Sequence, residues 1–503
     1  MKHLKRLTAL LLSAIVLLNA GLALAIQDGF RTTYTYNYDY WGDIAESPDA
    51  YRVQQVIYSS SLGLETPMRR PQSLYVRGQE IYVCDTGNNR ILQLKRDGNE
   101  YSLVRIIDRV SGAEPETFNT PGDVFADEEG NVYICDTNNN RVLMADKDLR
   151  FVRSYVKPVD NTFDQNIAFL PSKMVVDTSG RVYVRATNVN KGLIKYEADG
   201  TFTGFIGANP VIYSLWDYIW KEFFTTKEQR AQQASFVPTE YENICIDKDG
   251  FIYATNTVFS EYDLKWDNAK PIRRLNSIGS DILIKNDKYP PIGDLDWVEQ
   301  SVDYGPSKFK DITVLDNDIY IAFDKTRGRL FGYDPQGVML WAFGTKGNSE
   351  GAFLGAVSIE HMGTDLLCLD ENENSITVFT ATEYGNLIYQ ASDQYLKGDY
   401  EGSADTWREV LKLNANYNLA FIGIGRALMR EEKFGEAMDY FKRAHDRQNY
   451  GRAYRYYRKE MIEKNILWVV VVVAVLLIVP VVVNRVKKIK AEVEEYDRRK
   501  VRS

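Results

Sequence analysis

The sequence predicts a mainly β protein built as a six-bladed β-propeller, followed by a helical segment and one apolar helix. The first observation is a repeated unit of about 50 residues that begins at Pro71, Pro121 and Pro171. Each unit contains short strands separated by turn residues, which is typical of four-stranded propeller blades. The second observation is a change to a helical period of apolar residues from Asn386 onward. The third is an uncharged apolar run close to the end of the chain.

Three repeated units are sharp and three are degraded, but all six keep the order of strand, turn and strand. One residue marks the second strand of each unit. These residues are Tyr82, Tyr133, Tyr183, Tyr253, Tyr320 and Leu367. The preceding turn is often Asp-x-x-Gly, in which glycine supplies the positive φ that a tight hairpin needs. We therefore expect one blade per unit across residues 51–380.

Fourth strands follow as looser apolar runs, for example at 103–107, 202–206, 273–278 and 338–343. The sixth unit has none, because the chain turns helical after Phe379. A matching run precedes the first unit at residues 51–58, and we expect it to complete the last blade and close the ring. Closure buries the exposed sheet edges. A seven-bladed ring is the alternative, if the stretch from Trp266 to Tyr289 forms its own blade.

Two insertions interrupt the period, at 208–237 and 258–300, and a tyrosine-rich segment at 26–50 precedes the propeller. The first insertion carries apolar residues at helical spacing, among them Tyr213, Trp216 and Trp220. This spacing predicts an amphipathic helix on one face of the ring. Its aromatic residues either pack on the propeller or form a surface for a sugar or a partner. The tyrosine-rich segment alternates like a strand and is expected at the rim.

Two polar turns follow the second strand in the first two repeats, "DTGNNR" and "DTNNNR". They contain Asp85, Asn88 and Arg90 in one repeat, and Asp136, Asn139 and Arg141 in the other. This Asp-x-x-Asn-x-Arg pattern resembles that of the NHL repeat family, over residues 51–380. The resemblance implies an NHL-type propeller in which the aspartate and the arginine tie neighbouring strands together. We therefore expect these six residues to be a structural signature.

Two 34-residue units align within residues 384–447, with Trp407 matched to Phe441. Their period and the stretch "GDYEGSADTWREVLKLNANY" resemble tetratricopeptide repeats. That resemblance implies helix pairs that present a concave surface to a protein partner. The candidate partner-binding residues are polar residues on the first helix of each pair, namely Gln390, Asp393, Gln394 and Arg426. A plain spacer between propeller and membrane is the alternative role.

Both ends of the chain carry membrane-related signals. Residues 1–25 have a basic start, an apolar run and an Ala-x-Ala site, which predicts a signal peptide. Residues 466–483 are apolar enough to span a membrane, after an expected juxtamembrane helix at 451–465. The tail at 484–503 holds eight basic and four acidic residues, so it is expected in the cytoplasm. The predicted location is the plasma membrane, crossed once, with the large domain outside.

Charge and cysteine content narrow the function further. The net charge of the chain is −8, and the exported part is more acidic because both ends are basic. Nucleic acid is therefore not expected as a partner, since phosphate binding needs a basic surface. The cysteines Cys84, Cys135, Cys245 and Cys368 each lie in an apolar strand. We expect them to be small buried hydrophobic residues rather than disulfides.

No catalytic constellation stands out in the sequence. Lyases related to such propellers use histidine-ligated zinc, whereas His361 is the one histidine within residues 51–380, so no metal site is expected. Gluconolactonase-type enzymes use Glu, Asn and Asp around a central divalent cation, and no spacing here identifies three that converge. The sequence favours a binding or scaffold protein without a cofactor, for a protein or carbohydrate partner. The resemblance to bacterial membrane-anchored propellers implies a setting beside a solute transporter. An extracellular lactonase or lyase with a central metal is the alternative.

Overall fold

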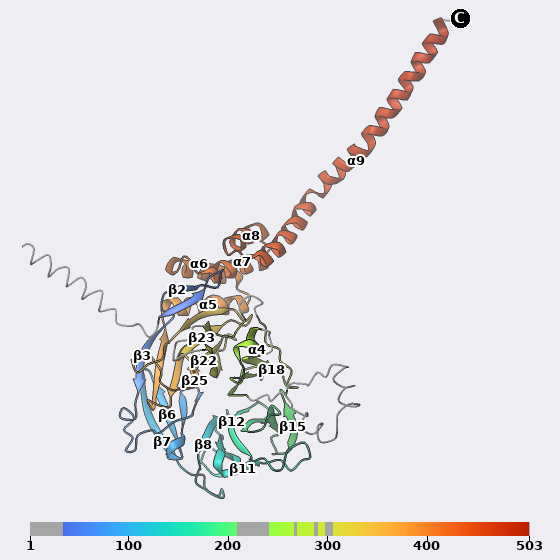
Figure 1. Cartoon of the computed structure of the whole chain (residues 1–503). Coiled ribbons are helices and arrows are strands. Elements are labelled where there is room, and N and C mark those ends of the chain that lie inside the picture. Colours follow the sequence, from blue (N-terminus) through green and yellow to red (C-terminus); the bar gives the residue numbers. More distant parts are fainter. Residues whose placement is uncertain (1–33, 209–240, 266–268, 286–289, 297–304, 502–503) are drawn as a thin grey trace, which may run out of the picture. The chain divides into compact units, whose positions relative to one another are not determined.

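The computed structural model describes residues 34–208, 241–265, 269–285, 290–296 and 305–501. These residues divide into two compact units, one ending at Ser392 and the other beginning at Asp393. The first unit is a six-bladed β-propeller (Figure 1). The predicted signal peptide lies outside the described residues, and so do the predicted aromatic residues Tyr213, Trp216 and Trp220.

The first three blades each contain four antiparallel strands. Blade 1 consists of β4 (Ser73–Arg77), β5 (Glu80–Asp85), β6 (Arg90–Asp97) and β7 (Glu100–Ile107). Blade 2 consists of β8 (Pro121–Ala126), β9 (Val132–Asp136), β10 (Arg141–Ala145) and β11 (Phe151–Val156). Blade 3 consists of β12 (Leu170–Val176), β13 (Val182–Thr187), β14 (Leu193–Tyr196) and β15 (Phe202–Ile206). Val, Ile and Tyr are frequent in these strands because they suit a pleated, half-buried surface.

Asp-x-x-Gly turns join the first two strands in blades 2, 3 and 4, as their sequence predicts. In blade 2, Asp127 Oδ1 accepts hydrogen bonds from the backbone amides of Glu129 at 3.0 Å and Asn131 at 2.9 Å. Gly130 has a φ of +89°, which a residue with a side chain rarely adopts. Asp177 and Asp247 repeat this bonding in the next two blades. The aspartate therefore fixes the turn, and the glycine permits it.

The fourth blade differs from the expectation. Its described strands are β16 (Ile244–Ile246), β17 (Ile252–Thr255) and β18 (Ile272–Leu275). The run at 273–278, expected to be a fourth strand, supplies the third strand instead, since β18 pairs with β17. Helix α4 (Glu261–Lys265) and its flanking loop separate these two strands along the chain. The stretch 258–300 is therefore not entirely an insertion, and its described residues add no seventh blade.

Blade 5 is widened by a hairpin from the start of the described chain. Its own strands are β21 (Phe309–Val314), β22 (Tyr320–Asp324), β23 (Arg329–Tyr333) and β24 (Met339–Phe343), preceded by the short pair β19 (Leu295–Asp296) and β20 (Gly305–Pro306). The hairpin of β1 (Thr35–Tyr38) and β2 (Ile44–Ser47) joins the outer edge, where β1 pairs with β24. Tyr36 donates a hydrogen bond of 2.7 Å to Asp294, and Arg329 pairs with the same carboxylate. The tyrosine-rich segment thus covers a sheet edge.

The last blade contains a strand from much earlier in the chain. Its inner strands are β25 (Ala356–Met362), β26 (Asp365–Asp370) and β27 (Ser375–Ala381), and its outer strand is β3 (Tyr51–Ile57). β3 runs antiparallel to β27, with Ile57 opposite Ile376 and Tyr51 opposite Ala381. In Figure 1 the blue strand β3 lies beside the orange strands of this blade. The innermost strands of successive blades pack in order, and β25 packs against β4, so the ring is closed.

The hydrophobic core of the propeller lies between neighbouring blades. One cluster joins Ile57 and Leu369 of blade 6 to Leu74 and Ile81 of blade 1. Other clusters join blades 1 and 2, and blades 2 and 3, in the same way. Cys84 and its counterparts in blades 2 and 6 are fully buried within strands, as small hydrophobic residues are. No blade therefore completes its core without its neighbour.

The second unit is helical, as the change of period predicts. Its helices are α5 (Glu383–Leu396, which begins in the first unit), α6 (Tyr400–Leu413), α7 (Asn418–Arg430), α8 (Phe434–Arg443) and α9 (Arg447–Val501). A Cβ atom at Gly423 would lie 2.4 Å from Nε1 of Trp407, and one at Gly425 would lie 2.6 Å from the Phe441 ring. Glycine at these positions therefore lets α7 approach both α6 and α8 closely.

Helix α9 includes a segment long and apolar enough to cross a membrane. This segment, Val470–Glu495, contains a window with a mean hydropathy of 2.4 and no buried residues. It overlaps the span expected at 466–483. The residues expected as a juxtamembrane helix, 451–465, belong to the same continuous helix (Figure 1).

Removal of β3 should open the last blade and destabilise the ring. A chain that begins at Glu65 lacks the buried side chains of Tyr51 and Ile57 and leaves β27 with an unpaired edge. Burial of each large apolar side chain contributes about 2 kcal/mol, so we expect the melting temperature to fall by about 10 °C or more. A chain that begins at Asp49 is the matched control, because it loses the β1–β2 hairpin but keeps β3. Equal melting of the two chains by circular dichroism would contradict closure by β3.

Candidate functional site

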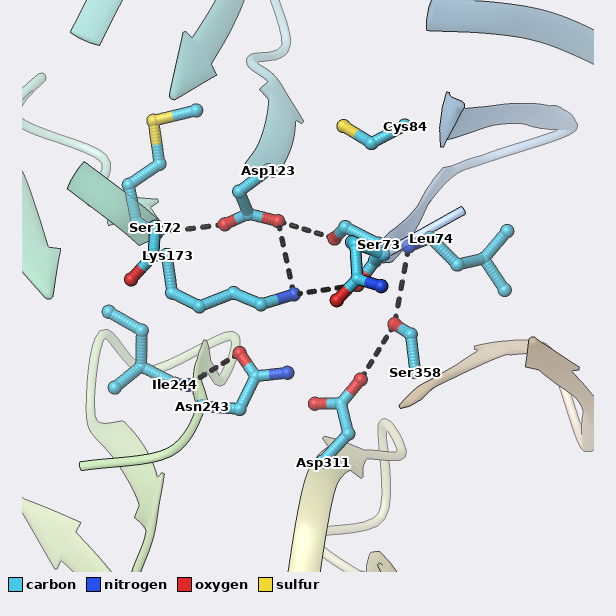
Figure 2. Close-up of polar contacts among 12 residues, drawn as sticks. Ser73, Leu74, Cys84, Asp123, Ser172, Lys173, Asn243, Ile244, Asp311 and Ser358 are labelled. Atoms are coloured by element: carbon cyan, nitrogen blue, oxygen red, sulfur yellow. Dashed lines mark hydrogen bonds and ion pairs between the residues drawn. The ribbon is translucent and has the colours of Figure 1, made fainter. Parts of the chain in front are cut away.

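Six polar residues form one layer across the central channel of the propeller. They occupy equivalent positions at the innermost strands of successive blades: Ser73, Asp123, Lys173, Asn243, Asp311 and Ser358. All six are at most 9% exposed. Figure 2 shows their side chains converging from different blades. The closed ring therefore gathers polar groups that are far apart in the sequence.

Lys173 reaches across this layer toward blades 1 and 2 (Figure 2). Its ammonium lies 3.7 Å from Asp123 Oδ1 and 3.4 Å from the carbonyl oxygen of Gln72. Burial by itself lowers the pKa of a lysine, but the carboxylates of Asp123 and Asp311 outweigh this effect and raise the pKa of Lys173. The side chain is therefore a buried ammonium at neutral pH.

Hydrogen bonds continue the layer from blade to blade. Asp123 of blade 2 accepts a hydrogen bond from the Ser73 hydroxyl of blade 1. The Ser358 hydroxyl of blade 6 accepts from the backbone amide of Leu74 at 3.2 Å and donates to Asp311 Oδ2 at 2.7 Å. Together with the ammonium contact, these bonds connect blades 5, 6, 1, 2 and 3.

The Asp311 carboxyl titrates close to neutral pH. Burial raises its pKa to about 6, while the Lys173 ammonium and hydrogen bonds from Ser358, Ile359 and Ile312 oppose the rise. At pH 7 this carboxyl is mostly ionised. The layer then holds one buried ammonium and two buried carboxylates.

The polar layer forms part of the lining of a cavity of about 740 Å³. This volume lies within the range of small-molecule sites. Residues two positions farther along the innermost strands also line the cavity: Tyr75, Phe125, Val175, Cys245, Thr313 and Glu360. The rings of Tyr75 and Phe125 lie against each other, with centroids 4.7 Å apart. The cavity thus has an aromatic side from blades 1 and 2 and a polar side from blades 5 and 6.

The polar side contains a hydrogen-bonded cluster of Glu360, Thr313 and His361. Thr313 Oγ1 lies 3.3 Å from Glu360 Oε2 and 2.7 Å from His361 Nδ1. Burial, and then the nearby Asp311 carboxylate, raises the pKa of Glu360 well above its ordinary value of 4.5. Burial lowers the pKa of His361 from its ordinary value of 6.5. Both directions favour the uncharged forms.

The channel residues do not fit the divalent cation of a lactonase-type site. Such a cation needs several carboxylate and amide oxygens to converge on it, whereas here the Lys173 ammonium lies against Asp123. Asn243 Oδ1 accepts a hydrogen bond from the amide of Ile244 at 2.8 Å, and both oxygens of Asp311 accept hydrogen bonds. Among the described residues, no three His, Cys, Asp or Glu side chains are placed to hold a metal ion. A positive side chain takes the position beside the carboxylates.

The predicted signature residues of blade 1 hold the loop that enters the blade. Asp85 Oδ2 accepts hydrogen bonds from Asn88 at 2.9 Å and from Arg90 at 2.7 Å, and its other oxygen accepts from the amide of Arg69. Arg90 also donates to the carbonyl oxygen of Thr66 at 2.6 Å. This geometry is that of a structural clasp between the second strand, the third strand and the preceding loop.

The signature residues of blade 2 repeat this clasp. Asp136 accepts hydrogen bonds from Asn139 at 2.8 Å and from Arg141 at 2.9 Å. Arg141 also donates to the carbonyl oxygens of Glu114 and Pro115 in the preceding loop. Asp136 is fully buried, so its carboxylate faces protein and is not presented to a ligand.

The predicted partner-binding residues lie on α5 and α7, outside the channel. Gln390 is exposed, and Asp393 forms an ion pair of 2.7 Å with a lysine one turn later on the chain. Gln394 accepts a hydrogen bond from the Thr406 hydroxyl at 2.7 Å, so packing between α5 and α6 engages this residue. Arg426 is half-buried on α7. Of the three predicted residues on α5, Gln390 is therefore the most exposed, and Asp393 and Gln394 are half-buried.

The channel layer and the Glu360 cluster are not predicted from the sequence. The layer residues stand 47 to 70 positions apart and each looks ordinary beside its neighbours. Alignment of the six units at the start of the first strand places Ser, Asp, Lys, Asn, Asp and Ser in one column, and this column is the available signal. In the sequence, His361 is notable only as the one histidine within residues 51–380, yet in the structure it lines the cavity.

Comparisons with known proteins do not place the chain in a family. No model of a protein family matches the sequence, and no curated protein matches it. Virginiamycin B lyase from Staphylococcus aureus is similar at 13% identity and a TM-score of 0.39, covering 70% of this chain and 89% of that chain. A protein designated a gluconolactonase is similar at 10% identity and a TM-score of 0.39, and the match covers 67% of this chain and 94% of that chain. Hydrazine synthase from Kuenenia stuttgartiensis is similar at 9% identity and a TM-score of 0.37, and the match covers 69% of this chain and 95% of that chain. Similarity at these levels assigns no activity.

Replacement of Glu360 by glutamine should stabilise the protein as pH rises. A carboxyl whose folded pKa is raised stabilises the fold fully below its ordinary pKa, and this contribution is lost as pH rises through the folded pKa. Glutamine has no such proton to lose, so the stability advantage of Glu360→Gln over the natural protein should grow from pH 4.5 to pH 8. Each unit of raised pKa corresponds to about 1.4 kcal/mol.

Urea unfolding at several pH values measures this difference. The ionisable side chains nearest Glu360 are Asp311, Asp123 and His361, and all three residues are kept in the variant. Glu100→Gln, on the exposed edge strand β7, is the matched control and should show no such trend. A stability difference that stays constant over this pH range would mean that Glu360 is not held in its protonated form.

Proposed function

We propose that the chain is a membrane-anchored extracytoplasmic binding protein, whose propeller and helical repeats receive separate ligands. The observation that carries this proposal is the channel itself. Its buried charged groups have partners within the layer, beside a cavity of about 740 Å³. Lys173 lies against Asp123, and Asp311 accepts a hydrogen bond from Ser358. A preformed cavity with an aromatic side and a few polar groups suits binding. A central-metal lactonase or lyase is disfavoured, because the ammonium stands beside the carboxylates that such a metal would need.

The proposed location follows from the two ends of the chain. A signal peptide at 1–25 would export the propeller, and the apolar segment of α9 would hold it at the plasma membrane. The basic tail at 484–503 would remain in the cytoplasm. In this arrangement the propeller repeats are NHL-type and their clasps are structural. A position beside a solute transporter would bring a captured carbohydrate to its carrier.

The helical segment is proposed to bind a protein partner. Its two 34-residue units and the close packing of α7 against α6 and α8 are features of tetratricopeptide-like helix pairs. The polar residues on α5 and α7 that would contact the partner are Gln390, Asp393, Gln394 and Arg426. Gln394 contributes less than the others, because its side chain already accepts a hydrogen bond from Thr406.

The topology can be tested by proteolysis of intact cells, or of spheroplasts where an outer membrane is present. One epitope is placed in the loop at Val159, which is 95% exposed, and another after Ser503. External protease should remove the first epitope and spare the second. Permeabilised cells, in which both should be lost, provide the control. Survival of the Val159 epitope in intact cells would overturn the proposed topology.

Partner binding can be tested by crosslinking in membranes. Asp393→Lys and Arg426→Glu reverse two charges on the proposed surface, and we expect the main crosslinked neighbour to be lost from the double variant. Asp405→Lys on α6 is the matched control, since that aspartate is also an exposed helical carboxylate paired with a neighbour. An unchanged set of crosslinks from a folded double variant would leave the helical segment as a spacer.

A further inference from the structure

The two sides of the propeller cavity differ in chemistry, and they meet where blade 6 adjoins blade 1. Phe125 and Tyr75 belong to the innermost strands of blades 2 and 1, whereas Thr313 and Glu360 belong to those of blades 5 and 6. In a ring of six, blades 2 and 5 are diametrically opposed. A ligand in this cavity therefore meets an aromatic surface on one side and hydrogen-bonding groups on the other.

The hydrogen-bonding cluster can serve as a donor or an acceptor. The Thr313 hydroxyl has a single proton and two close partners, Glu360 Oε2 and His361 Nδ1. One partner must therefore donate to Thr313 and the other must accept from it. Thr313 can donate to Glu360 Oε2 while His361 Nδ1 donates to Thr313. When the Glu360 carboxyl is protonated on Oε2, the carboxyl can instead donate to Thr313 and the threonine to His361 Nδ1. Glu360 Oε1 is then an acceptor, and a shift of the protons along the cluster reverses these roles.

The charges of the buried layer give little preference for an ion, although acidic residues outnumber basic ones in the lining of the cavity as a whole. Lys173 would repel a cation, while Asp123 and Asp311 would repel an anion, and all three are held in the same buried layer. At the mouth, the Asp177 and Asp247 carboxylates are occupied by backbone amides and by arginine partners. An uncharged ligand avoids both kinds of repulsion.

We propose that this cavity binds a small neutral carbohydrate, with its ring against Phe125 and Tyr75 and its hydroxyls bonded to Glu360 and His361. This inference rests on the proposed binding function and names its ligand class and site. A hydroxyl group both donates and accepts, as the Glu360–Thr313–His361 cluster does. The apolar face of a sugar ring complements an aromatic surface in the same way that other apolar groups do. The volume of about 740 Å³ accommodates a ligand of this size.

The test uses the full-length protein in detergent and a panel of neutral mono- and disaccharides. At equal concentration, the corresponding sugar acids and amino sugars serve as charged counterparts. We expect at least one neutral sugar to raise the melting temperature and to bind by calorimetry, and its charged counterparts to bind at least about tenfold more weakly. Absence of binding by every neutral sugar, or tighter binding of the charged forms, would overturn the proposal.

Substitutions at the cavity test whether the sugar binds at this site. Glu360→Leu removes the hydrogen-bonding group without leaving a buried charge and should weaken binding at least about tenfold. Glu360→Gln keeps a donor and an acceptor and should restore most of the affinity. Phe125→Leu should weaken binding by removing the ring, while Glu100→Gln on β7 should leave binding unchanged. Equal affinity of Glu360→Leu and the natural protein would exclude this site. That result would not affect the crosslinking test, which reports on the helical segment.

Discussion

The pairing of β3 with β27 is the constraint on which the rest of the propeller depends. Every core cluster described here draws side chains from adjacent blades, so a ring with one open blade would leave apolar surface exposed at the break. The ring also fixes the distances among the six innermost strands. Only under that condition can Lys173 of blade 3 remain within 3.7 Å of Asp123 in blade 2 while hydrogen bonds link blades 5, 6 and 1. The polar layer, and the function proposed for the cavity, therefore depend on closure of the ring.

The polar layer in turn sets the chemistry of the cavity. Burial of an ammonium with two carboxylates carries a desolvation cost that their attraction offsets only in a good geometry. Such a layer contributes more to a single defined arrangement than to stability. Because Asp311 is mostly ionised at pH 7, a second negative charge at nearby Glu360 is disfavoured. Burial and the Asp311 carboxylate thus favour the protonated form of Glu360, which is in hydrogen-bond contact with Thr313 at the cavity wall.

The propeller was largely predictable from the sequence because its signals are local. The Asp-x-x-Gly turns, the marker tyrosines and the missing fourth strand of the last unit all lie within one repeat or at its edge, and the six blades follow from them. The sequence predicts β18 as a fourth strand, whereas it is the third strand of blade 4. The prediction is wrong because α4 and its loop lie between the second and third strands and shift the apparent order. The channel layer is a different case. Its members become neighbours only through ring closure, so no local pattern around Lys173 or Glu360 indicates their surroundings.

Aspartates illustrate why composition alone does not locate the site. Asp127 fixes a turn through backbone amides, Asp136 holds a loop through Asn139 and Arg141, and Asp123 faces the channel beside an ammonium. Aspartate therefore serves three different structural purposes in blade 2, and in each case the carboxylate oxygens already have partners within the protein. An acidic sequence suggests many carboxylates for a metal or a cationic ligand, yet the described fold uses these three internally. Beside these carboxylates the cavity wall offers the Glu360 carboxyl, a hydroxyl, an imidazole and two aromatic rings, and these groups suit a neutral polar ligand.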